Sequence, residues 1–206
     1  MKLNSVSCPS FQKTLVAHAK FTKNIQDGKP QDCKIYVLDS YNDIGYFSKL
    51  RNKESWKNPY FLDNLECELP SCLDSRGHMN TYVMEMGDEG ECIAYAQSDR
   101  DYNTSKIDYL ETAPIYQNSP YNPSCTNVKY IGETFLAFFA KQAKQQRKGK
   151  IELIAIYRAL PFYKEKCGFV SSSPWNNFVL SLPCDRYKHL IKQNKKHIGS
   201  KLTIEG

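Results

Sequence analysis

The chain has 206 residues, of which 41% are hydrophobic and 24% are charged, and this is the composition of an ordinary globular domain. It has no run of about 18 apolar residues that could span a membrane, and residues 1–12 lack the apolar segment of a signal peptide. We therefore expect one domain over residues 1–206, a cytoplasmic location and no membrane partner. The net charge of +6 identifies neither a nucleic acid nor an anionic ligand by itself.

The cysteines are numerous but scattered. There are eight, none in a Cys-x-x-Cys pair, and the four histidines do not cluster with them. We expect buried free thiols and no metal site. The cysteines are Cys8, Cys33, Cys67, Cys72, Cys92, Cys125, Cys167 and Cys184.

The N-terminal third has mixed patterns. Residues 10–27 place Phe11, Leu15 and His18 or Ala19 at helical spacing, which predicts a helix that ends at Gly28. Residues 34–38 alternate as a strand, and residues 42–53 predict a second helix with Asn42 or Asp43 as its cap. Residues 54–77 show no sustained period and contain two prolines, so we expect a connecting loop or an acceptor-binding segment.

The middle of the chain predicts antiparallel strands. Residues 81–86 and 91–97 are strand-like runs on either side of the polar turn 87–90, which is the pattern of a β-hairpin. A further strand over residues 106–112 extends this hairpin into a meander.

A strand, a helix and a strand follow one another from residue 106 onward. The helix begins near Ile131, places Phe135, Phe138 and Phe139 on one face, and ends with basic residues before Gly149. Residues 151–156 form an apolar run typical of a strand covered on both faces. Such a crossover makes its two strands parallel. The fold class is therefore α+β, with an antiparallel meander leading into a parallel βαβ pair, flanked by helices.

The C-terminal residues predict one more strand, at residues 175–182, and a basic helix at residues 185–196. We expect this helix to belong to a basic tail that frays from about residue 186.

The start of the central helix is a candidate anion site. Its first-turn amides, at Gly132, Glu133 and Thr134, lack partners within the helix and carry partial positive charge. A pyrophosphate group fits such a turn, and Gly132 would allow close approach. A single glycine at a helix start also serves packing alone.

About a third of the chain resembles the GNAT superfamily of N-acetyltransferases. The matching segments are Leu110-Glu111-Thr112, the loop 127–132, and the segment from Ala159 through Phe162-Tyr163 to Gly168-Phe169. Tyr130 stands where the family has the first glycine of its pair, and Asn127 replaces a glutamine or arginine.

The resemblance implies acetyl-CoA or another short acyl-CoA as the cofactor and an amine as the acceptor, and it is compatible with a homodimer. It implies that the cofactor contacts the end of the first strand and the loop and first turn of the helix. The implied residues are Leu110, Thr112, Asn127, Val128, Lys129, Tyr130, Ile131, Gly132, Glu133 and Thr134.

The resemblance also implies two catalytic residues. Tyr163 occupies the position of the tyrosine that protonates the leaving thiolate, and Glu111 is a candidate for relaying a proton from the amine. The alternatives are a core aromatic residue for Tyr163 and a solvated or lysine-paired carboxylate for Glu111.

The predicted function is direct transfer of an acyl group, most simply acetyl, from the thioester to an amine of a small molecule or peptide. Two alternatives stay open. One is a catalytically silent acyl-CoA-binding or protein-interaction module of the same fold. The other is a basic nucleic-acid-binding protein, which rests on net charge and lacks interleaved basic and aromatic residues.

Overall fold

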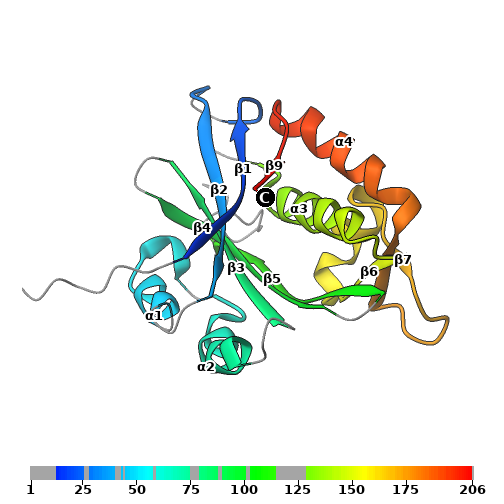
Figure 1. The fold of residues 1–206 in the computed structure, drawn as a ribbon, viewed down its shortest axis with the longest axis horizontal. Helices are drawn as coiled ribbons and strands as arrows, with labels where there is room; N and C mark the ends of the chain where they lie inside the picture. The colour runs from blue at the N-terminus through cyan, green and yellow to red at the C-terminus, as the bar shows by residue number, and fades with distance from the viewer. Residues whose placement is uncertain are drawn as a thin grey trace, which may run out of the picture.

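The computed structural model describes residues 13–25, 28–39, 43, 45–57, 59–74, 79–87, 90–100, 103–114 and 129–205. These residues build one nine-stranded sheet in the order β7-β8-β6-β5-β4-β3-β2-β1-β9 (Figure 1). Every neighbouring pair is antiparallel except β5 and β6, which are parallel. The strands are β1 (Thr14–Phe21), β2 (Gln31–Leu38), β3 (Met79–Met86), β4 (Glu91–Arg100), β5 (Thr104–Thr112), β6 (Lys150–Ile154), β7 (Val170–Ser171), β8 (Val179–Pro183) and β9 (Thr203–Ile204).

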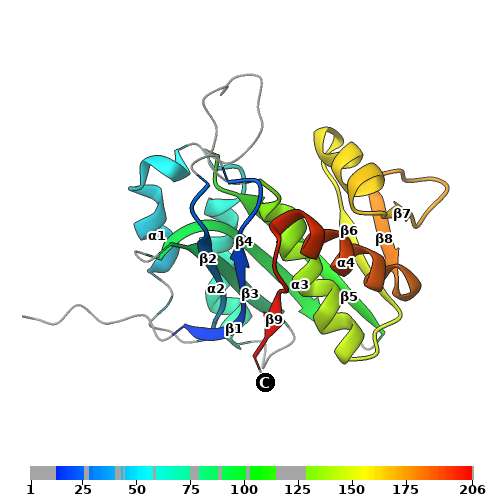
Figure 2. The same cartoon turned by 90° about the horizontal axis from the view of Figure 1, so that it is seen from above.

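Helices cover both faces of the sheet. The helices α3 (Ile131–Gln145) and α4 (Tyr187–Ile198) pack on one face, and α1 (Tyr46–Arg51) and α2 (Leu62–Asp74) pack on the other (Figure 2). Each face has its own apolar cluster. Phe135, Phe138 and Phe139 lie in the first cluster, and Trp56 and Leu65 lie in the second. No helix among the described residues is long and apolar enough to cross a membrane.

The predicted meander is confirmed. Strands β2, β3, β4 and β5 pair in sequence order, and the parallel β5–β6 pair follows through α3. The α+β class, with its mixed sheet and flanking helices, is therefore the observed architecture.

The helix predicted at residues 10–27 is wrong, because residues 14–21 within it form β1 instead. The buried side chains are Ala17, Ala19 and Phe21, whereas His18 and Lys20 are exposed, and this is the period of two of a strand. Pairing with β2 on one side and with β9 on the other decides the conformation.

Residues 54–77 are not simply a connecting loop. They contain the short 3-10 turn η2 (Glu54–Trp56) and the helix α2, whose buried residues Leu62, Leu65 and Leu69 recur at spacings of three and four. Pro70 lies inside α2 and hides this pattern, because proline removes a helical N–H donor. The helix predicted at residues 42–53 is present as α1 but is shorter, and its N-cap is Gly45 rather than Asn42 or Asp43.

The central helix is confirmed, but its C-terminal end and the strand that follows it differ from the prediction. It stops at Gln145, and Arg147, with φ of 56°, takes the left-handed conformation expected of Gly149. In addition, β6 is not covered on both faces, because the Ile154 side chain is 75% exposed.

The C-terminal residues do not form a loose tail. Helix α4 packs on α3 through buried Tyr187, Leu190 and Ile198, and β9 then adds an edge strand to the sheet beside β1. The basic residues of α4 occupy its solvent face, which is why the charge pattern looked like that of a tail.

Candidate active site

Strand β5 extends beyond the residues that pair with β6. The parallel ladder runs from Thr104–Lys150 to Ile107–Leu153 and ends there, while β5 continues to Thr112. We call the stretch Asp108–Thr112 the open edge of β5. It is held on one side by β4 and has no ladder partner on the other among the described residues.

The open edge presents backbone groups to its unpaired side. The Ala113 amide donates to the Ile93 carbonyl at 2.8 Å. Since hydrogen-bonded pairs alternate along an antiparallel ladder, Glu111 and Tyr109 bond to β4, and the amide groups of Leu110 and Thr112 face away from it. Leu110, which is predicted to contact the cofactor, therefore turns its amide toward the side of β5 that faces away from β4.

A β-bulge marks the point at which β5 leaves β6. Gln97 pairs with Tyr109 and Ser98 pairs with Ile107, so Asp108 is the extra residue. Partial burial, followed by the charges of Asp99 and Glu68, raises the pKa of the Asp108 carboxyl group, and Lys106 opposes this shift. The bulge thus places a carboxyl group of raised pKa at the beginning of the open edge.

The first turn of α3 begins with a strained residue. Tyr130 is the N-cap and has φ of 69°, a left-handed conformation that favours glycine. Tyr130 occupies the position at which the GNAT superfamily has a glycine. The left-handed backbone conformation is therefore present here, although glycine adopts it more easily than tyrosine does. The first helical bond joins the Thr134 amide to the Tyr130 carbonyl at 2.9 Å, which leaves the amides of Ile131, Gly132 and Glu133 outside the helical ladder.

Gly132 lies against the segment that follows β6. A Cβ atom at this position would be 3.4 Å from Cζ of Phe162 and 3.9 Å from Cγ2 of Thr112. Phe162 begins the π-helical turn η5 (Phe162–Lys166), an irregularity found often at functional sites. The fold therefore brings together the three predicted segments: the end of β5, the start of α3 and the segment after β6.

The side chains of this first turn face inward. Ile131, Glu133 and Thr134 are all buried, so the turn can meet a ligand only through its backbone. Glu133 was predicted only as an amide donor at the helix start. Its carboxylate instead bonds to α4, which sequence reasoning had assigned to a tail.

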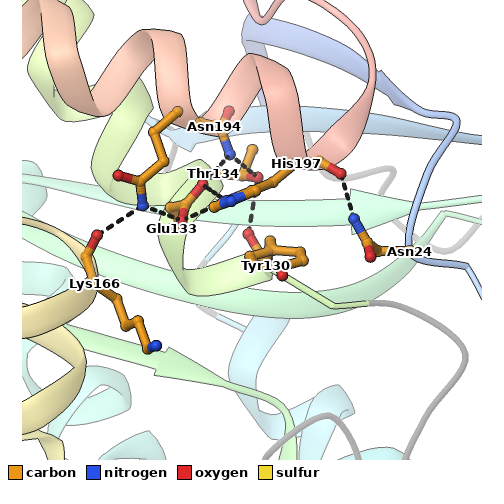
Figure 3. A network of polar contacts seen from close by, with 8 residues as sticks. Asn24, Tyr130, Glu133, Thr134, Lys166, Asn194 and His197 are labelled. Carbon is orange, nitrogen blue, oxygen red and sulfur yellow. Dashed lines mark hydrogen bonds and ion pairs between the residues drawn. The ribbon is translucent and has the colours of Figure 1, made fainter.

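Figure 3 shows this polar network. The His197 Nδ1 atom lies 3.0 Å from both oxygens of Glu133, and Asn194 donates to Glu133 at 3.4 Å and to Thr134 at 2.9 Å. Gln193 donates to Glu133 at 3.0 Å and to the carbonyl of Lys166, in η5, at 2.7 Å. Helix α4 thus links the first turn of α3 to the segment after β6.

Tyr163 is buried in the apolar cluster under α3. Its ring packs edge-to-face against Phe162 and Phe169, at centroid distances of 5.1 Å and 5.7 Å. Burial, and after it the neighbouring Cys167 thiol, raises the pKa of the Tyr163 phenol. The hydroxyl group therefore stays protonated at neutral pH, which is the form that a proton donor needs.

Glu111 is buried on the opposite face of the sheet, the face covered by α1 and α2. Its carboxylate accepts hydrogen bonds from the amides of Tyr60 at 2.8 Å and Phe61 at 3.0 Å, and from the Tyr95 hydroxyl. Its oxygens are thus engaged in holding the residues before α2. A role for Glu111 in proton transfer stays a prediction.

The residues that Glu111 holds reach across to the segment after β6. The Arg158 guanidinium lies 5.3 Å from the centroid of the Tyr60 ring. Arg158 belongs to the turn η4 (Tyr157–Ala159), which follows β6, whereas Tyr60 precedes α2. No sequence pattern pointed to this pair, because a contact between exposed residues so far apart leaves no periodic signal.

Other predicted residues fall outside this group. Asn127 and Val128 lie outside the described residues. Lys129 is exposed, and its amide donates to the Asn24 carbonyl at 3.2 Å. A surface cavity of about 420 Å³ lies elsewhere, between α1 and α2, and contains none of the predicted residues; its lining is Arg51, Trp56, Lys57, Pro59 and Asp63.

The described cysteines are free thiols of two kinds. Cys33, Cys92 and Cys167 are buried, whereas Cys67 and Cys184 are exposed. Burial raises the pKa of all three buried thiols, to about 12 for Cys92, and so keeps them protonated and poorly nucleophilic.

The architecture is thus that of an α+β protein in which a parallel strand pair separates beside a helix N-terminus. No protein-family model matches the sequence, and no curated protein matches it. Solved structures do match, and acetyltransferases are among them.

A putative GNAT-family acetyltransferase from Desulfovibrio desulfuricans has a TM-score of 0.53 at 11% identity, over 74% of this chain and 99% of that one. A spermidine N-acetyltransferase from Vibrio cholerae, a dodecamer, has a TM-score of 0.50 at 15% identity, over 75% of this chain and 95% of that one. AtaTR bound with AcCoA has a TM-score of 0.51 at 12% identity, over 77% of this chain and 97% of that one. The chain therefore has the GNAT fold.

Proposed function

We propose that the protein is an N-acyltransferase that transfers a short acyl group, most simply acetyl, from acyl-CoA to an amine. One observation carries the proposal: the open edge of β5, the first turn of α3 and the segment after β6 meet at Gly132, Thr112 and Phe162. The solved structure with bound AcCoA supports the choice of coenzyme, because it shares this fold.

The residues present fit an acyl-CoA. The amides of Ile131, Gly132 and Glu133 lie outside the helical ladder and suit the pyrophosphate, and the backbone amide of Leu110 suits the amide-containing arm. When bound, the coenzyme supplies an acyl group already activated as a thioester.

The protein's own contribution is alignment and proton transfer. The backbone of the open edge holds the acyl arm in an extended form, and Tyr163 protonates the departing thiolate. Two carboxyl groups are candidates for accepting the proton of the amine. Glu111 is the predicted one. Asp108 is the second candidate, because the bulge places it at the beginning of the open edge and its pKa is raised above the usual value of an aspartate.

Two measurements test the proposal. Titration calorimetry with coenzyme A is expected to show saturable one-site binding, and a screen of polyamines, amino acids and peptide amines with acetyl-CoA is expected to release free thiol with at least one acceptor. Binding without thiol release would favour the silent module. Binding to generic DNA or RNA with none to coenzyme A would favour the nucleic-acid alternative.

A further inference from the structure

The carboxylate of Glu133 stands in the turn where the proposed function places a pyrophosphate. It is the third residue of α3, and its side chain is 2% exposed. A carboxylate in the first turn of a helix is favourable by itself, because it interacts with the positive end of the helix dipole. It also repels a second anion at the same end, and the repulsion is strong because the group is shielded from water.

Helix α4 supplies the donors that compensate this carboxylate. Gln193 and Asn194 each give one amide hydrogen bond, and the imidazole of His197 is 3.0 Å from both carboxylate oxygens. The His197 contact is central among the three, since it alone engages both oxygens (Figure 3). A buried carboxylate that loses such a donor is left partly uncompensated.

The same imidazole supports the strained residue at the start of α3. The His197 and Tyr130 rings are stacked, with centroids 4.3 Å apart and planes inclined by 24°. The His197 carbonyl accepts a bond of 2.6 Å from the Asn24 side chain, and the Asn24 carbonyl accepts from the Lys129 amide. A left-handed tyrosine persists only where its surroundings hold it, and His197 is the side chain stacked on its ring.

We propose that His197 is a positioning residue for the coenzyme's pyrophosphate. It fixes Tyr130 and compensates Glu133, the residues on either side of Ile131 and Gly132, so that the amides between them can donate hydrogen bonds to a phosphate group. The inference rests on the proposed acyl-CoA site and deepens it, because it assigns a task in anion binding to α4.

The test separates stacking from charge compensation. The variant His197→Phe keeps a ring to stack on Tyr130 but removes the donor to Glu133. We expect coenzyme A to bind about tenfold more weakly to this variant. Pantetheine, which contains no phosphate, is expected to keep its wild-type affinity. The matched control His189→Phe changes an exposed histidine of α4 and is expected to bind both ligands as the wild type does.

Removing the charge supplies the second arm. Glu133→Gln is expected to bind coenzyme A as tightly as the wild type or more tightly, although it loses stability, and the double variant is expected to recover most of the affinity lost in His197→Phe. The affinity of Glu133→Gln for coenzyme A tests the positioning role even if the single His197→Phe variant does not fold, because a purely structural network predicts weaker binding for Glu133→Gln.

The contradicting results are distinct. If the wild type binds coenzyme A and folded His197→Phe binds it equally well, or loses coenzyme A and pantetheine affinity equally, the positioning role is wrong while the proposed function stands. If the wild type binds no coenzyme A, the proposed function fails and this role fails with it.

Discussion

The Cα atom of Gly132 faces the ring of Phe162 so closely that a Cβ atom there would lie 3.4 Å from Cζ. One residue starts α3 and the other starts the turn after β6, so their contact joins the two elements that border the proposed coenzyme site. This distance is at the short limit of van der Waals contact, so an alanine at position 132 would touch Phe162 and a larger side chain would require the ring to shift.

The first prediction concerns this contact. Gly132→Ala is expected to leave the fold intact and to weaken coenzyme A binding by several-fold, about 1 kcal/mol, because the added methyl group crowds both Phe162 and the backbone approach to the phosphates. Calorimetry measures the affinity, and circular dichroism checks the fold. Gly45→Ala is the matched control, since no atom lies within 4 Å of its Cβ position. Unchanged affinity in folded Gly132→Ala would move the phosphate site elsewhere.

The second prediction tests Tyr163 as the proton donor. Tyr163→Phe is expected to lower kcat by about 10²–10⁴-fold, since only the phenolic oxygen is lost while the packing against Phe162 and Phe169 is kept. Coenzyme A affinity should not change. Because burial raises the Tyr163 pKa, the wild-type rate should not fall from ionisation of this group below about pH 10.

The control for this experiment is Tyr157→Phe, which removes the hydroxyl of an exposed tyrosine in η4. Both variants are compared on the best acceptor, under conditions in which chemistry limits the rate. A Tyr163→Phe enzyme that retained more than about half of the wild-type kcat would show that solvent or another group protonates the thiolate.

The third prediction concerns Glu111. Glu111→Gln is expected to destabilise the protein by about 2–3 kcal/mol, because an amide cannot accept from the Tyr60, Phe61 and Tyr95 donors together. Hydrogen exchange at the Tyr60 and Phe61 amides should accelerate. Glu54→Gln, which alters an exposed carboxylate paired with Lys57, is expected to change stability by less than about 0.5 kcal/mol.

Activity of the same variant separates two roles of Glu111. If the carboxylate only anchors the residues before α2, the KM for the amine should rise while the pH dependence of kcat is kept. Loss of the acidic limb of the kcat profile, with protected Tyr60 and Phe61 amides, would instead identify Glu111 as the base.

The fourth prediction concerns the pH dependence of stability that the buried thiol and phenol groups produce. Burial raises the pKa of Cys33, Cys92, Cys167 and Tyr95. Above about pH 8.5 the thiols ionise in the unfolded chain but not in the folded one, so the unfolded state binds fewer protons and stability falls as the pH rises. Each thiol lowers the free energy of unfolding by up to about 1.4 kcal/mol per pH unit above about pH 8.5, and Tyr95 adds to this slope only above about pH 10.

Urea denaturation at a series of pH values under reducing conditions measures this slope. Replacing the buried Cys33 by alanine should make the slope shallower between about pH 8.5 and 10, whereas replacing the exposed Cys67 should not. Equal slopes in the two variants would contradict the assignment of the effect to burial.

The sequence was sufficient for the elements whose local pattern and packing environment agree. Helix α3 was predicted because its buried side chains recur at the helical period, and strands β3, β4 and β5 were predicted as short strand-like runs separated by polar turns. The order strand, helix, strand then fixed the parallel pairing of β5 with β6. Gly132 was predicted from the pattern of a helix start, and the role of Tyr163 was implied by the resemblance of its motif to the GNAT superfamily. Neither prediction needs knowledge of distant contacts.

Tertiary structure alone decided the rest, because it depends on residues far apart in sequence. Residues 14–21 satisfy a helical period as well as a strand period, and the neighbouring edges of β2 and β9 select the strand. The basic surface of α4 suggests a loose tail until its buried face meets α3, and only that packing brings His197 to Glu133 and Tyr130. Glu111 is adjacent to predicted cofactor residues in sequence, yet the alternation of a strand turns it to the opposite face of the sheet.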